Sequence, residues 1–218
     1  MAVTGSFTPQ QAVNTARLRH PALTALVLDD PELLDDINQA IRVMMIAATK
    51  IKPECLMQQT GDLALAGADG ATADLEWTEG EPVGIPRALE ALQGGVRVRV
   101  LMRTNIEQRE AMARELVDDG RPGGIWIRDA VNNRWALKQI VNWATVTAIA
   151  AYGPFFPTAV TSPTLNTELL LPFVLFGPLT EYLAVQLAHR SDLGGEWFTA
   201  QQAGSQAALE QALTEFTL

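Results

Sequence analysis

Apolar residues in the first part of the chain recur at helical spacing. A hydroxyl residue followed by proline, Thr8-Pro9, is typical of a helix start, and Pro21 should end that helix near residue 20. The acidic run from Asp29 to Glu32 predicts a second start, because carboxylates stabilise the positive end of the helix dipole. This second helix should end near residue 51, ahead of Pro53. Its apolar residues recur in steps of three and four and predict one buried face: Leu34, Ile37, Ile41, Met44, Met45 and Ala48.

The middle of the chain changes to shorter elements. Glycine and proline recur between residues 56 and 95, which is typical of loops and short strands. The alternation Val96-Arg97-Val98-Arg99-Val100 predicts a strand with one buried face and one solvent-facing side. Apolar segments on either side of Asn132-Asn133 predict a β-hairpin, and a β-branched run over 145–152 predicts a further strand.

Three more helices are expected. Thr104 to Glu107 has the pattern of a capping box, so a helix should run from there to about residue 118, with Glu110 and Arg114 paired one turn apart. Helical patterns also cover 172–190 and about 197–216. The last of these should have one packed face: Phe198, Ser205, Ala208, Leu209, Ala212 and Phe216.

The order of these elements predicts an α+β fold, in which terminal helices form a helical core around a β-rich insert. We expect N-terminal core helices over 1–55, a β-rich insert with one short helix over 56–165, and C-terminal core helices with a terminal tail over 166–218. The apolar stretch Leu169 to Ala188 is long enough to cross a bilayer, but it contains Pro172, Pro178 and Glu181. We therefore interpret it as a buried or interfacial helix and expect no membrane partner. The first residues have no basic segment followed by an apolar one, so we also expect no secretion signal.

The composition of the chain limits the kinds of binding site that it can form. The 218 residues carry 16 Lys and Arg against 25 Asp and Glu, a formal charge of −9, which argues against a protein that grips nucleic acid through its phosphates. Cys55 is the single cysteine, so an internal disulfide and a cysteine zinc site are both excluded. A lone cysteine without an evident activating partner is interpreted as a small apolar residue.

The search for catalytic motifs is negative. The sequence has no phosphate-binding loop, no dinucleotide-binding turn, no nucleophile elbow and no His-Glu-x-x-His helix. His20 and His189 fall at predicted helix ends, where an imidazolium complements the dipole. The pairs Asp29-Asp30, Asp35-Asp36 and Asp118-Asp119 are interpreted as caps and solvated charge rather than metal ligands. We expect no catalytic residue, no metal and no cofactor, hence a protein that is not an enzyme.

Some residues are candidates for contacts between copies. Trp197 and Phe198 begin the last helix after two glycines, and large aromatics are enriched in the cores of interfaces. Arg97 and Arg99 lie on the solvent-facing side of their strand, where they could pair with carboxylates of a neighbouring copy. The other tryptophans, Trp126, Trp135 and Trp143, are expected to pack in the sheet core.

Two segments carry a family resemblance. The first is Thr8 to Pro53, with Leu28-Asp29-Asp30-Pro31-Glu32-Leu33-Leu34-Asp35-Asp36-Ile37-Asn38-Gln39-Ala40. The second is Leu171-Pro172 followed by Leu183-Ala184-Val185-Gln186-Leu187-Ala188, ahead of an Ala-rich final helix. In this order, and separated by a β-rich insert, the segments resemble the head–tail adaptor (connector) proteins of tailed bacteriophages.

The resemblance implies a structural protein of the virion neck, assembled in the host cytoplasm. It implies a homo-oligomeric ring, usually a dodecamer, that docks under the capsid portal and meets a tail or head-closure protein. The family's C-terminal segment commonly contacts the portal, which points to Ala212, Phe216 and Leu218. Genomic DNA would pass through the ring during ejection without sequence-specific binding, and the acidic charge repeated around a ring would repel it.

Other functions are compatible with the same residues. One is a different neck or tail-completion ring. Alternatives from other classes are a small cytoplasmic α+β enzyme with a site of scattered carboxylates, and a monomeric regulatory binding module. Three or more carboxylates converging in a pocket would favour the enzyme, whereas a ring bound to a portal would favour the adaptor.

Overall fold

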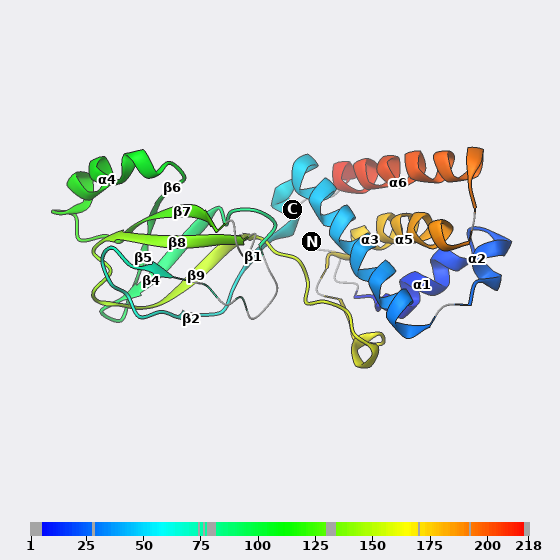
Figure 1. The fold of residues 1–218 in the computed structure, drawn as a ribbon, viewed down its shortest axis with the longest axis horizontal. Helices are drawn as coiled ribbons and strands as arrows, with labels where there is room; N and C mark the ends of the chain where they lie inside the picture. The colour runs from blue at the N-terminus through cyan, green and yellow to red at the C-terminus, as the bar shows by residue number, and fades with distance from the viewer. Residues whose placement is uncertain are drawn as a thin grey trace. The chain divides into compact units, whose positions relative to one another are not determined.

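The computed structural model divides the chain into two units, one of helices and one of strands (Figure 1). The helical unit contains residues 1–56 and 156–218, and the β unit contains residues 57–155. The structure describes residues 6–27, 29–73, 75, 77, 82–129, 134–169, 171–191 and 193–215, with the side chains of Asp30, Cys55, Asp129 and Arg134 excepted. The predicted α+β class is confirmed, with helices from both ends of the chain and strands between them.

The helical unit is built around one buried helix. Nine of the fifteen residues of α5 (Phe176–Arg190) are buried, and α5 packs against α1, α3 and α6. A helix that is apolar on most of its surface is stable only when neighbours cover it. The unit's other elements are α1 (Pro9–Arg17), α2 (Pro21–Ala25), α3 (Asp30–Ile51), α6 (Gly195–Glu215) and the 3₁₀ turns η1 (Pro53–Leu56), η3 (Ser162–Thr164) and η4 (Phe173–Leu175).

The helices α1 and α3 begin where the sequence predicts, because side chains cap their first turns. The Thr8 hydroxyl accepts from the Gln11 amide at 3.2 Å, and the Gln11 side chain accepts from the Thr8 amide at 2.9 Å. The Asp29 carboxylate accepts from the Glu32 amide at 2.9 Å at the start of α3. The predicted buried face of α3 is confirmed for Ile37, Ile41, Met44, Met45 and Ala48, and Leu34 at its edge is half-buried.

The insert ends earlier than residue 165, the boundary that we expected. Residues 156–165 belong to the helical unit, because hydrogen bonds attach them to α1 and α3. The Asn38 side chain donates to the carbonyl of Val160 at 3.0 Å and accepts from its amide at 2.8 Å. The Gln10 amide also donates to the carbonyl of Leu165 at 3.0 Å. Asn38 thus satisfies both backbone groups of a residue 122 positions away.

Replacing Asn38 should loosen this attachment. Asn38→Ala leaves the amide and carbonyl of the buried Val160 without partners, so the free energy of unfolding should fall by about 2 kcal/mol. Asn14→Ala is the matched control, because Asn14 is exposed on α1 and its side chain accepts only from Gln10. Urea unfolding followed by circular dichroism measures both variants; equal effects would contradict the role given to Asn38.

The β unit consists of two sheets. Strands β1 (Met57–Gln59), β9 (Val146–Pro154), β4 (Ala88–Gln93) and β5 (Val96–Arg99) form one sheet in that order, with β2 (Leu63–Ala64) also pairing with β9. The other sheet has the order β3 (Thr72–Ala73), β8 (Arg134–Val141), β7 (Gly123–Asp129), β6 (Leu101–Arg103). All pairs are antiparallel except β6 and β7, whose parallel pairing is bridged by the helix α4 (Arg109–Leu116).

Successive side chains of β7 point to opposite faces of the second sheet, and both faces are packed. Trp126 packs between the sheets, whereas Ile125 and Ile127 pack against α4 on the opposite face. The predicted core role of the tryptophans is confirmed: Trp126 and Trp143 are buried, and Trp135 packs against the same cluster. The Trp143 indole donates to the Gly123 carbonyl at 2.7 Å. The predicted hairpin joins β7 to β8, although Asn132 and Asn133 lie outside the described residues.

Two expectations in the β unit are wrong in detail. Val96 is 62% exposed, because it stands at the turn end of the edge strand β5, and the buried side of the alternation begins only at Val98. The capping box does not form at Thr104. Asn105 instead caps the 3₁₀ turn η2 (Ile106–Gln108), accepting from the Glu107 amide at 2.9 Å, and α4 begins after that turn.

The expected ion pair on α4 is also absent. The Arg114 guanidinium donates to the backbone carbonyl of Glu110 at 3.3 Å and makes no ion pair with the Glu110 carboxylate. Glu110 lies in the first turn of α4 and Arg114 in its last, so the guanidinium turns back along the helix to the backbone instead of meeting the carboxylate.

Candidate interaction surfaces

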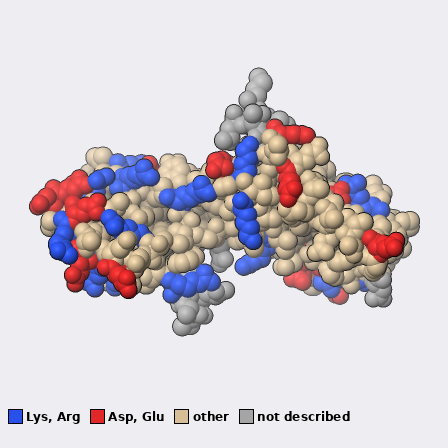
Figure 2. All heavy atoms as spheres, turned by 90° about the horizontal axis from the view of Figure 1, so that it is seen from above, with Lys and Arg blue, Asp and Glu red and all other residues tan. Residues whose placement is uncertain are grey.

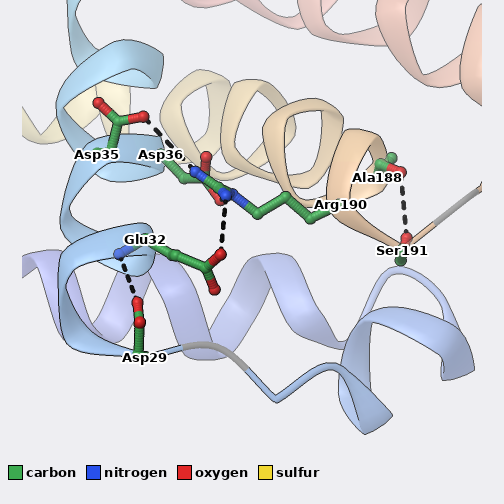
Figure 3. Close-up of polar contacts among 7 residues, drawn as sticks. All are labelled: Asp29, Glu32, Asp35, Asp36, Ala188, Arg190 and Ser191. Atoms are coloured by element: carbon green, nitrogen blue, oxygen red, sulfur yellow. Dashed lines mark hydrogen bonds and ion pairs between the residues drawn. The ribbon is translucent and has the colours of Figure 1, made fainter.

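Carboxylates of α3 converge on one guanidinium in the helical unit (Figure 3). Arg190, at the end of α5, donates from Nε to the Asp36 carboxylate at 2.7 Å. Its Nη1 lies 3.3 Å from Glu32 and its Nη2 lies 3.5 Å from Asp35. Asp36 is 5% exposed, whereas the Asp35 side chain is 80% exposed, so the innermost contact is shielded from water and the outermost is not.

Burial and pairing act on Asp36 in opposite directions. Burial raises the pKa of Asp36 above its ordinary value of 3.8, and the hydrogen bond and charge of Arg190 oppose that rise. The hydrogen bond to Asp36 raises the pKa of Arg190 in turn. The cluster is therefore an ion pair of the protein's own residues, and it joins the start of α3 to the end of α5.

The interpretation of Asp35-Asp36 as solvated charge is thus wrong for Asp36. Its position carried a signal, because Asp36, Ala40 and Met44 follow one another at i+4 and the last two are on the buried face. A carboxylate on a buried stripe needs a cation, and Arg190 supplies it. Asp29 acts as the expected cap, and Asp119 forms an ion pair with Arg121 at 2.5 Å.

The carboxylates of the cluster already bind Arg190, and none of them lines the three grooves formed by described residues. Asp35 is the member whose side chain stays open to water. Across residues 6–215 with the stated gaps, no group of three or more His, Cys, Asp or Glu side chains is arranged to hold a metal ion. Among the described residues, no helix is long and apolar enough to cross a membrane, and α5, which covers the second half of the stretch from Leu169 to Ala188, is one of the helices that fall short.

The two histidines pack against the aromatic residues at the start of α6. Trp197 packs edge-on against His20 with 5.2 Å between ring centroids, and Phe198 packs against His189 at 4.7 Å. Both aromatic residues are half-buried by these contacts within the chain, so each has less surface left for a second copy. Their role as subunit contacts stays a prediction. His189 lies in the last turn of α5, as expected.

His20 lies at a different kind of helix end from the one predicted. It is the N-cap of α2, and its Nδ1 accepts from the Ala22 amide at 3.1 Å. Pro21, expected only to stop α1, also occupies the first position of this next helix. A short helix of five residues was missed because it has no apolar periodicity of its own.

The arginines of β5 differ from each other. Arg97 pairs with Asp62 of the same chain at 2.7 Å, and its contact with a neighbouring copy stays a prediction. Arg99 is exposed and forms no ion pair with any described residue, although Glu90 lies opposite it on β4. Arg99 borders an open groove of about 290 Å³ with Arg87 and Arg121.

The predicted portal contact is only partly described. Ala212 is half-buried on α6, between the buried Leu209 and Leu213, so most of its surface serves the packing of α6 on the helical core. Phe216 and Leu218 lie outside the described residues. The contact therefore stays a prediction.

A groove beside α3 and α6 is the largest of the described ones. It has a volume of about 560 Å³, its floor includes Tyr182 of α5, and residues from α3 and α6 form its walls. The α3 wall contains Val43, Ile46, Ala47, Lys50 and Ile51, and the α6 wall contains Gln202, Ser205 and Gln206. Burial and the nearby charge of Glu210 raise the pKa of Tyr182 above 10.0, so its hydroxyl is a neutral donor at the base of the groove.

Comparisons with known proteins identify no family for this chain. No protein-family model matches the chain, and no curated protein matches its sequence. The functional argument therefore rests on the residues and their arrangement.

Proposed function

We propose that this chain is a head–tail adaptor of a tailed bacteriophage, a structural ring protein that joins the capsid portal to the tail. The observation that carries the proposal is the two-unit architecture. Both ends of the chain build one helical unit, and a separate β unit is inserted between α3 and α5. This is the order of elements that the sequence resemblance implies, and the segments that carry the resemblance, α3 and α5, pack directly on each other.

The helical unit has features that suit repeated packing. The face of α6 away from α5 exposes small residues, Ala200, Ala203, Gly204 and Ala207, which allow another helix to approach closely. Both units carry an acidic excess. The helical unit has six Lys and Arg against twelve Asp and Glu, and the β unit has ten against thirteen. Figure 2 shows both signs interspersed on the face it presents, so the acidic excess forms no continuous field there.

The proposal assigns the end of α6 to the portal. Replacing both Phe216 and Leu218 by Ser should weaken binding to the portal protein of the same virus by at least about tenfold, because apolar anchors dominate interface energies. The matched control is Gln211→Ser with Thr214→Ser, two exposed α6 positions one turn apart. Co-sedimentation with portal rings measures binding, and the melting temperature of each variant checks the fold. Equal binding by the anchor variant and the control would exclude this contact.

A further inference from the structure

A second apolar stripe runs along α3, outside the core. Val43, Ile46, Ala47 and Ile51 follow one another at helical spacing on the wall of the α3–α6 groove. Ile46 is 38% exposed and Ile51 is 40% exposed, although the core face of the same helix is fully covered. Val43 and Ala47 are half-buried where α3 packs beside α6, whereas Ile46 and Ile51 remain open to solvent, so this exposed apolar pair indicates a partner.

The charges of α3 are separated along its length. The segment 29–36 contains five Asp and Glu and no Lys or Arg, whereas the segment 42–52 contains Arg42, Lys50 and Lys52 and no acid. The two segments lie at opposite ends of a helix of 22 residues, about 33 Å long at 1.5 Å per residue. Lys50 is exposed in the wall of the groove, and the Asp35 side chain is 80% exposed near the other end.

The acidic end also carries an exposed apolar residue. Val27, two residues ahead of the Asp29 cap, is 92% exposed. Each end of the helix offsets its own dipole, which accounts for the signs of the charges. The dipole does not account for Val27 at one end or for the isoleucines in the groove at the other.

We propose that the α3–α6 groove of one copy binds the acidic start of α3 and Val27 of a second copy. Lys50 of the first copy then faces Asp35 of the second, and Val27 enters between Ile46 and Ile51. When each copy binds one neighbour through its groove and another through its acidic start, the contact is head-to-tail, and a head-to-tail contact generates a ring when its rotation closes. This inference rests on the proposed function, since it names the contact that builds the ring.

Charge reversal in the groove tests the contact. Lys50→Glu and Ile46→Asp should each weaken association of the chain, alone or on portal rings, by at least about tenfold in dissociation constant. The matched controls are Arg109→Glu on α4 and Val96→Asp on β5, which make the same changes at exposed positions of the β unit. Combining Lys50→Glu with Asp35→Lys should restore association, because the pair is re-formed with its signs exchanged. Sedimentation velocity measures association, and thermal melting shows that each variant is folded.

Cross-linking gives a direct readout. Copies with ordinary nitrogen and copies with nitrogen-15 are mixed and treated with a carbodiimide, which joins an amine to a carboxylate at zero length. Peptides that join Lys50 of one isotope to Asp35 or Glu32 of the other support the contact. If rings form but the groove variants assemble like the controls, this inference is overturned and the adaptor proposal stands. If no ring forms alone or on the portal, the adaptor proposal fails and the contact fails with it.

Discussion

Arg190→Met should lower the free energy of unfolding of the helical unit by about 3 kcal/mol at pH 7, because it leaves the buried Asp36 carboxylate without its cation. The loss should depend on pH. Burial already raises the pKa of Asp36, and without Arg190 nothing in the cluster opposes that rise. Above pH 3.8 the folded variant therefore binds more protons than the unfolded chain, and its stability should rise as the pH falls from neutral toward 4. Urea unfolding at several pH values measures this slope.

Two variants make the Arg190 experiment specific. Asp36→Asn combined with Arg190→Met should recover most of the stability and flatten the slope, since no uncompensated carboxylate remains. Arg121→Met removes a pair of similar length between Arg121 and Asp119 on an exposed surface, and it should change stability little. An Arg190→Met loss that is equal at pH 7 and pH 4 would contradict a buried charge as its cause.

Gly67→Ala should destabilise the β unit by about 3 kcal/mol or more, because the added methyl has no space. A Cβ at this position would lie 2.0 Å from the carbonyl oxygen of Trp143 and 2.9 Å from that of Val146. Both neighbours are backbone atoms that cannot rotate away. The Trp143 carbonyl also accepts from the Val146 amide at 2.9 Å, so moving it disrupts the start of β9.

The control for Gly67 is another glycine. A Cβ at Gly204, on the exposed face of α6, meets no atom within 4 Å, so Gly204→Ala should stabilise the chain by up to about 1 kcal/mol through its helix propensity. Thermal melting followed by tryptophan fluorescence reports on the β unit, which contains Trp126 and Trp143. A Gly67→Ala protein that melts like the parent would contradict the close approach of these two segments.

The sequence predicts the helices well because their signals are local. Capping at Thr8 and Asp29 and the apolar spacing along α3 depend on residues within a few turns of each other. The contacts that the sequence did not reveal join distant residues: Asp36 and Arg190 are 154 positions apart, and Asn38 and Val160 are 122 apart. No local pattern specifies such partners, although a carboxylate in the buried i+4 series of α3 indicates that one is needed.

In the strands too, local patterns were predicted and pairing between strands was not. Alternation predicted β5, but whether Val96 is buried depends on its place at the turn end of an edge strand, which pairing decides. The parallel pairing of β6 with β7 was not predicted, because the hairpin signal covers only β7 and β8. The sequence singled out the aromatic pair at the start of α6 as candidate subunit contacts, which stays a prediction, but it did not reveal that the two histidines are their partners within the chain.

The most direct test of the adaptor proposal is electron microscopy of this chain mixed with portal rings of the same virus. The proposal predicts a closed ring of copies stacked coaxially on one end of the portal, with the helical unit in the ring wall and the end of α6 at the portal. Portal rings that stay bare across salt and protein concentrations, or copies bound singly without a ring, would contradict it.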